Sequence, residues 1–234
     1  MGRALVVALL AAGCGSQPAV DYGRSLFEDT SISSAASNPF KCSTCHEIGA
    51  TTTKSLPGYT MYDAAVRQAW WGGQVTTLLD ATNQCVTEFM RGKALAADDD
   101  KGRALFVYLA SLAPDMTAQA LPLTVVQNIV DVPSGDAGRG KMWWDQGCGN
   151  CHGAPHTGEG RISTVASLVP DDSIAAHGTD PVTGARPVVI EKVRHGKFFN
   201  VGGNMPLFSV EALSDAQLGD ILAYLETFGL PPSP

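Results

Sequence analysis

Two short runs of the chain share the pattern Cys-x-x-Cys-His, which places two thiols and an imidazole within five residues. The first run is CSTCH at residues 42–46, and the second is CGNCH at residues 148–152. Two thiols at this spacing can form thioethers to the vinyl groups of one porphyrin, and the adjacent histidine can bind its iron. The expected haem-binding residues are Cys42, Cys45 and His46 in the first run and Cys148, Cys151 and His152 in the second.

A zinc site or a thiol-redox pair is the alternative for each run. Structural zinc takes four ligands, and neither run has a second Cys/His pair nearby at finger-like spacing. The same pattern occurring twice in one chain also argues against chance. We therefore predict two covalently bound c-type haems, each containing one iron.

Length and composition limit the fold and the partners. The chain has 234 residues, of which 44% are hydrophobic and 17% charged, and this suits one large or two small globular domains. The two runs are 106 residues apart, which favours two domains of about a hundred residues each. The net charge of −7 argues against a nucleic-acid partner.

The hydrophobic pattern has a helical period throughout, and no segment alternates at period two. We expect helices at residues 61–71, 78–89, 101–112, 188–195 and 214–228. Three aspartates at positions 98–100 suit the start of the third of these helices. The predicted fold class is all-α. The inward-facing residues of the third and fifth helices are Leu105, Tyr108, Leu109, Leu112, Leu218, Ile221, Leu222 and Leu225.

Four segments follow from these patterns. Residues 1–14 are expected to be a lipoprotein-type signal segment, residues 21–113 a first haem domain, residues 114–134 a linker and residues 135–232 a second haem domain. The linker contains prolines but is too apolar for a flexible tether, so we expect it to dock across both domains. Gly23-Arg24 and Gly138-Arg139 precede the two runs in a weak internal repeat.

The N-terminal segment predicts export. Arg3 is followed by a short apolar stretch that ends in Ala11-Ala12-Gly13-Cys14, and this ending resembles a bacterial lipobox. The resemblance implies acylation of Cys14 and anchoring on the periplasmic side of a bacterial membrane. Ordinary secretory cleavage near Ala12 is the alternative.

Met205 is the predicted distal ligand of the second haem. Asn204-Met205-Pro206 lies about 20 residues before Leu225 and resembles the methionine loop of class I cytochromes c. That resemblance implies two class I cytochrome c-like domains, each wrapped around one covalent haem. A thioether ligand favours ferrous iron and raises the potential. The rival ligands are His156, His177 and His195, of which His195 is expected instead to cap the end of its helix.

The first domain contains no histidine except His46, so a second histidine ligand for its haem cannot come from within that domain. The candidates are Cys85, Met90, Met61 and Met116. Residues 83–95, together with Tyr108 and Leu109, resemble the Cys-ligated haem domain of thiosulfate dehydrogenases. The resemblance implies a Cys85 thiolate on the iron and a lower potential at this haem.

The same resemblance fails at one position that matters for catalysis. The family has a basic side chain just after the cysteine, whereas this chain has Thr87 and Glu88, with Arg91 and Lys93 further on. Glu88 would repel an anionic substrate. We therefore expect an electron carrier between periplasmic or membrane redox partners, such as other cytochromes or a respiratory complex. The alternative is a thiosulfate dehydrogenase-like sulfur oxidoreductase with its chemistry at the first haem.

Overall fold

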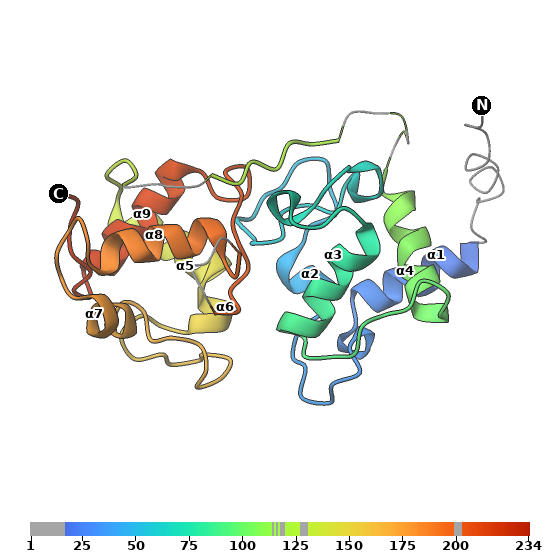
Figure 1. Ribbon diagram of the computed structural model, residues 1–234, viewed down its shortest axis with the longest axis horizontal. Coiled ribbons are helices and arrows are strands. Elements are labelled where there is room, and N and C mark those ends of the chain that lie inside the picture. The colour runs from blue at the N-terminus through green and yellow to red at the C-terminus, as the bar shows by residue number, and fades with distance from the viewer. Residues whose placement is uncertain (1–16, 114, 116, 118–119, 127–130, 199–202) are drawn as a thin grey trace, which may run out of the picture.

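The computed structural model describes residues 17–113, 115, 117, 120–126, 131–198 and 203–234 (Figure 1). These residues form helices and no strand, with isolated β-bridges only from Glu47 to Thr60 and from Trp70 to Val75. The prediction of an all-α fold is confirmed. Within the described part of the chain, no helix has the length and apolar character needed to cross a membrane.

The helices fall into an N-terminal and a C-terminal group. The first group comprises α1 (Gln17–Phe27), η1 (Thr30–Ile32), α2 (Cys42–Cys45), η2 (Ala64–Val66), η3 (Trp71–Gly73), α3 (Leu78–Gln84), the π-helix η4 (Cys85–Phe89) and α4 (Asp100–Ser111). The second comprises α5 (Ala137–Gly147), α6 (Gly149–His152), α7 (Asp171–His177), α8 (Ala185–His195) and α9 (Asp215–Glu226).

Each group has its own hydrophobic core. The first core joins side chains of α1 and α4 with residues of the π-helix, and the second joins side chains of α5, α8 and α9. The predicted inward-facing residues of α4 and α9 are buried in these two cores, except Leu112, which is only partly buried. Figure 1 shows the two groups side by side, with α2 and α6 on the sides that face each other.

A glycine lets each core helix pair approach closely. A Cβ atom on Gly23 of α1 would lie 2.0 Å from the carbonyl oxygen of Ala104 in α4. A Cβ atom on Gly140 of α5 would lie 1.9 Å from the carbonyl oxygen of Asp220 in α9. Both distances are far below van der Waals contact, so only glycine allows these helices to touch backbone to backbone.

These crossings correct the internal repeat that the sequence indicates. The residue that occupies the place of Gly23 in the second half is Gly140, not Gly138. Gly23 lies against the Cβ of Tyr108, and Gly140 lies against the Cβ of Tyr224, at the same place in the C-terminal helix of each pair. The repeated unit is therefore the crossing itself, and the Gly-Arg dipeptide is not aligned between the two halves.

The helix ends follow the expected capping chemistry. Asp99 caps α4 by accepting a hydrogen bond from the amide of Gly102. Ser214 and Gln217 form a reciprocal capping box at the start of α9. The predicted helices at residues 78–89, 101–112, 188–195 and 214–228 are confirmed to within a few residues, although residues 85–89 are a π-helix.

The predicted helix at residues 61–71 is wrong. Only the short η2 and the first residue of η3 fall there, and Asp63 adopts a left-handed conformation with φ of 62°. The buried Arg67 guanidinium donates to the carbonyls of Thr60 and Tyr62 and to the Asp63 carboxylate, at 2.8–3.0 Å. Those carbonyls are thus satisfied by a side chain, and the apolar periodicity of the segment reflects a packed loop.

Residues of the segment between the two groups contact both of them. The amide of Leu121 donates to Asp63 of the first group. Thr124 donates to the Glu211 carboxylate at 2.7 Å through both its amide and its hydroxyl. The carbonyl of Val126 accepts from His195 Nε2 at 2.8 Å. Ile129 and Val130, which contribute to the predicted docking, lie outside the described residues.

Replacing Gly140 by alanine should destabilise the protein by about 1–3 kcal/mol, because the added methyl group meets a helix backbone that cannot yield. Thermal unfolding of the haem-loaded protein would measure this loss. Gly138→Ala is the matched control on the same helix, where the new Cβ meets only Asp136 Oδ1, at 3.2 Å. Its higher helix propensity should leave stability unchanged or raise it by up to about 1 kcal/mol. Equal effects of the two substitutions would contradict the crossing assignment.

Candidate functional site

One cavity of about 570 Å³ contains the predicted chemistry of both halves. Its walls are mostly apolar and aromatic, and its volume is typical of ligand pockets. All eight residues that the sequence predicts as haem or iron ligands line it. They are Cys42, Cys45, His46, Cys85, Cys148, Cys151, His152 and Met205.

Hydrogen bonds to Glu28, the residue after α1, position the first Cys-x-x-Cys-His run. Glu28, just past the end of α1, accepts hydrogen bonds from Lys41 at 2.8 Å and from the Ser43 hydroxyl at 2.5 Å. The bond from Lys41 and then that from Ser43 lower the pKa of Glu28, so the carboxylate stays charged. The single turn of α2 then brings Cys42 and Cys45 to the same cavity.

The second run continues directly from a core helix. Cys148 is both the C-cap residue of α5 and the N-cap residue of α6. The crossing of α5 with α9 therefore also fixes the position of the run. Trp144 packs its ring against His152, with centroids 6.0 Å apart, and donates from Nε1 to the carbonyl of Gly153 at 2.9 Å. Trp144 is buried and supports the site, whereas the neighbouring Met142 is exposed.

Each run's histidine is oriented by a backbone carbonyl. His46 Nδ1 lies 2.8 Å from the carbonyl oxygen of Gly58, and His152 Nδ1 lies 2.9 Å from that of Ser167. A neutral imidazole that donates from Nδ1 keeps the lone pair of Nε2 for a metal, as metal-bound histidines usually do. Burial lowers the pKa of His46 to about 4, so this ring is neutral at physiological pH.

Gly58 is required by the orientation of His46. A Cβ atom at this position would lie 2.2–2.7 Å from three atoms of the imidazole ring. The Pro57-Gly58 pair is visible in the sequence as a turn, but the sequence does not show that the turn carries the histidine's partner.

The cavity fits a covalently bound porphyrin. Burial raises the pKa of Cys42, Cys45 and Cys148 to about 12, so these thiols are neutral and the surroundings favour an apolar group. Trp70, which lines the cavity, has a buried Nε1 with no hydrogen-bond partner among the residues that the structure describes. A buried donor of this kind suits a cofactor that carries acceptor oxygens, as the propionates of haem do.

Met205 lies in an irregular segment held from two sides. Lys192 Nζ donates to the carbonyl of Gly203 at 3.3 Å. Gly196, with φ of +58°, lets the end of α8 approach the Met205 carbonyl, because a Cβ atom there would lie 2.4 Å from that oxygen. The predicted loop is confirmed at residues 203–206.

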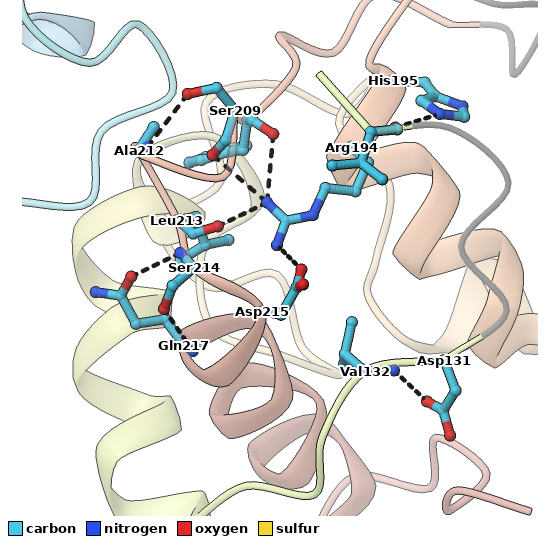
Figure 2. Close-up of polar contacts among 12 residues, drawn as sticks. Asp131, Val132, Arg194, His195, Ser209, Ala212, Leu213, Ser214, Asp215 and Gln217 are labelled. Atoms are coloured by element: carbon cyan, nitrogen blue, oxygen red, sulfur yellow. Dashed lines mark hydrogen bonds and ion pairs between the residues drawn. The ribbon is translucent and has the colours of Figure 1, made fainter. Parts of the chain in front are cut away.

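Arg194 fixes the chain that follows Met205 (Figure 2). Its fully buried guanidinium donates to the carbonyls of Phe208, Ser209 and Leu213 at 2.6–3.5 Å and to the Asp215 carboxylate at 2.6 Å. A buried charge with this many acceptors holds a loop in one conformation. The sequence offered no sign of this role for Arg194.

The rival histidines do not line the cavity. His156 is exposed and bonds to Asp171 through Nδ1 at 2.9 Å, and His177 is exposed at the end of α7. His195 is buried, and its ring contacts Glu191 and the carbonyl of Val126. The expected helix-capping role of His195 is thus replaced by a tie to the segment between the two halves.

Three of the four sulfur candidates for the first site line the cavity, namely Cys85, Met90 and Met61. Met116 lies outside the described residues. Cys85 begins the π-helix, in which the Met90 amide bonds to the Cys85 carbonyl at 3.1 Å. Met90 is packed into the first core, whereas Cys85 is only half-buried. Burial raises the pKa of Cys85 above its usual range, so its thiolate would need a cation beside it.

The surroundings of Glu88 differ from what the sequence indicates. Glu88 lines the cavity, but its carboxylate pairs with Lys197 at 2.9 Å. Arg91 also lines the cavity, while Lys93 does not, and its amide binds Ser34. The negative charge is therefore matched by a cation from the other half of the chain, which no pattern near Glu88 could reveal.

Residues 135–225 match the model of the family described as cytochrome c oxidase, cbb3-type, subunit III. This part of the chain is a cytochrome c domain, and that domain supports a c-type cytochrome, a haem protein that carries electrons. The match includes the second run and Met205 but does not extend to the first run. A comparison with curated proteins found no match.

Gly58→Ala should disturb the first haem and leave the second unchanged. The added methyl group would displace the His46 ring and its bond to the residue 58 carbonyl, with a stability cost of about 1–3 kcal/mol. Electron paramagnetic resonance of the ferric protein should show one haem with altered ligation. The second haem, whose histidine bonds to Ser167, is the internal control. Two unaltered haem signals would contradict this role of Gly58.

Proposed function

We propose that the protein is a dihaem c-type cytochrome that passes electrons between redox partners on the periplasmic side of a bacterial membrane. A bound haem supplies an iron that gains or loses one electron. The observation that carries the proposal is that both Cys-x-x-Cys-His runs line the same cavity. Electrons would pass through the protein from one haem site to the other, because the fold brings the two sites together.

The effect of Cys151 on the pKa of Cys45 supports the closeness of the two runs. Burial is the main cause that raises the pKa of Cys45 to about 12, and the neighbouring Cys151 of the other run adds to the rise. Charges influence each other in this way only over short distances. Cys45 would hold the first haem and Cys151 the second.

The two sites would differ in potential. Met205 is the proposed distal ligand of the second haem, since none of the described rival histidines lines the cavity. Cys85 is the proposed distal ligand of the first: Cys85 and Met90 both line the cavity, but Met90 is also packed into the first core, whereas Cys85 is only half-buried. A thiolate donates charge to iron and a thioether does not, so the first haem would have the lower potential.

The remaining assignments are proposed on the sequence. Residues 21–113 and 135–232 would be the two class I cytochrome c-like domains, joined by the linker 114–134. Cys14, which lies outside the described residues, would carry the lipid that anchors the chain to the membrane. Partners would be other cytochromes or a membrane respiratory complex.

A thiosulfate dehydrogenase-like activity is the second candidate. It is favoured by the pairing of Glu88 with Lys197, which reduces the repulsion of an anion, and by Arg91 in the cavity wall. Thiosulfate turnover with an artificial electron acceptor, lost on Cys85→Ala, would establish the enzyme. We expect no appreciable turnover, because the cation nearest Glu88 is already engaged in the ion pair.

The mass of the intact protein should exceed that of its processed polypeptide by two haems after maturation in a host that attaches haem c. Replacing Cys42 and Cys45 together by alanine should remove one haem, and replacing Cys148 and Cys151 should remove the other. The two double variants serve as controls for each other. A wild-type mass with a single haem would refute the dihaem proposal.

Met205→His should lower the potential of the second haem by an amount on the order of tenths of a volt, because imidazole favours ferric iron relative to a thioether. Cys85→Ala should raise the potential of the first haem and make it high-spin, whereas Met90→Leu should have little effect. A redox titration followed by optical spectra resolves both. The reverse order of effects at Cys85 and Met90 would assign Met90 as the ligand.

A further inference from the structure

We propose that Glu88 and Lys197, with Gln84 and Asn204, form a latch that positions Met205 over the second haem. The latch joins the helical segment that carries Cys85 to the loop that carries Met205. It rests on the proposed function, in which Met205 and a residue of the first half are distal ligands. Glu88 and Lys197 would be positioning residues, since they act through Met205.

Three contacts define the latch. Lys197 Nζ lies 2.9 Å from Glu88 Oε1 and donates to Gln84 Oε1 at 3.0 Å. Asn204 Nδ2 donates to the other oxygen of Glu88, Oε2, at 3.2 Å. Both oxygens of the Glu88 carboxylate are therefore bonded to the second half of the chain. Asn204 is directly followed by Met205.

The ion pair is partly shielded from water. The side chain of Lys197 is 20% exposed and that of Glu88 is 32% exposed. Beside it, Trp71 packs between Phe89 and Phe198, at centroid distances of 6.0 and 5.4 Å. Glu88 and Phe89 are neighbours in sequence, as are Lys197 and Phe198, so the aromatic cluster joins the same two segments as the ion pair.

The latch completes the support of the methionine loop. Gly203 is held by Lys192, and the carbonyls of Phe208 and Ser209 are held by Arg194, all within the second half. Among the bonds described for this loop, the bond of Asn204 to Glu88 is the one that comes from the first half. A thioether is a neutral, weakly binding ligand, so its hold on iron depends on how firmly the protein positions it.

The experiment separates positioning from simple electrostatics. Glu88→Gln removes a negative charge and Lys197→Met removes a positive charge, so a field effect alone shifts the potential of the second haem in opposite directions. Breaking a latch loosens Met205 in both variants. The readout is the affinity of the ferric haem-loaded protein for imidazole, which displaces methionine. Imidazole binding is monitored by the loss of the long-wavelength sulfur-to-iron absorption band, the band that should be missing in Met205→His.

We expect each single variant to bind imidazole about fivefold more tightly, the factor that corresponds to one half-buried ion pair. The double variant should bind imidazole no more tightly than either single variant, because both substitutions remove the same interaction. The exchanged pair Glu88→Lys with Lys197→Glu should restore wild-type affinity. Gln84 and Asn204 can serve either arrangement, since an amide both donates and accepts.

Asp145→Asn is the matched control, because it removes a carboxylate from an exposed ion pair with Lys141 on α5. It should leave imidazole binding unchanged. Unchanged imidazole affinity in both latch variants, with potentials shifted in opposite directions, would overturn the latch and leave Met205 ligation standing. A wild-type protein without a methionine band at the second haem would instead overturn Met205 as ligand, and the latch with it.

Discussion

The close crossing of two helix pairs is the contact on which the rest of this structure depends. At each crossing a glycine, Gly23 or Gly140, allows backbone to meet backbone, and a side chain of any size would push the helices apart. The second crossing fixes α5, and α5 runs into the turn that carries Cys148, Cys151 and His152. The packed core therefore fixes the position of the haem-binding residues that follow it in the chain.

The first half achieves the same result with a different connection. Its core helix α1 ends at Phe27, and an inserted segment, residues 28–41, separates it from the first Cys-x-x-Cys-His run. Glu28 bridges this gap by binding Lys41 and Ser43. The inserted segment gains some order of its own from Asp29, which caps η1. The second half has no such insertion and needs no such tie.

Polar groups then set the details that apolar packing leaves open. Backbone carbonyls of Gly58 and Ser167 orient the two histidines, and the Arg194 guanidinium fixes the chain after Met205. Buried polar groups demand partners, and the geometry of hydrogen bonds is stricter than that of apolar contact. Apolar packing therefore brings the elements together, while these bonds decide where each ligand side chain lies.

The sequence by itself determined the chemistry and the local structure. The two Cys-x-x-Cys-His runs, the helical stripes of α4 and α9 and the loop at Met205 are all local patterns, and the structure contains them where they were expected. Local patterns misled at residues 61–71, where the long side chain of Arg67 takes up carbonyls that a helix would otherwise use. The Gly-Arg repeat failed in the same way, because the crossing selects Gly140.

Only the tertiary structure decided how the two halves meet. That both runs line one cavity, that Glu88 pairs with Lys197 and that His195 bonds to Val126 are contacts between residues far apart in the chain. A single sequence carries no signal for such pairs, because nothing in the sequence around one partner identifies the other. The choice between Cys85 and Met90 is of the same kind, since both lie on one helical segment and only packing separates the buried methionine from the half-buried cysteine.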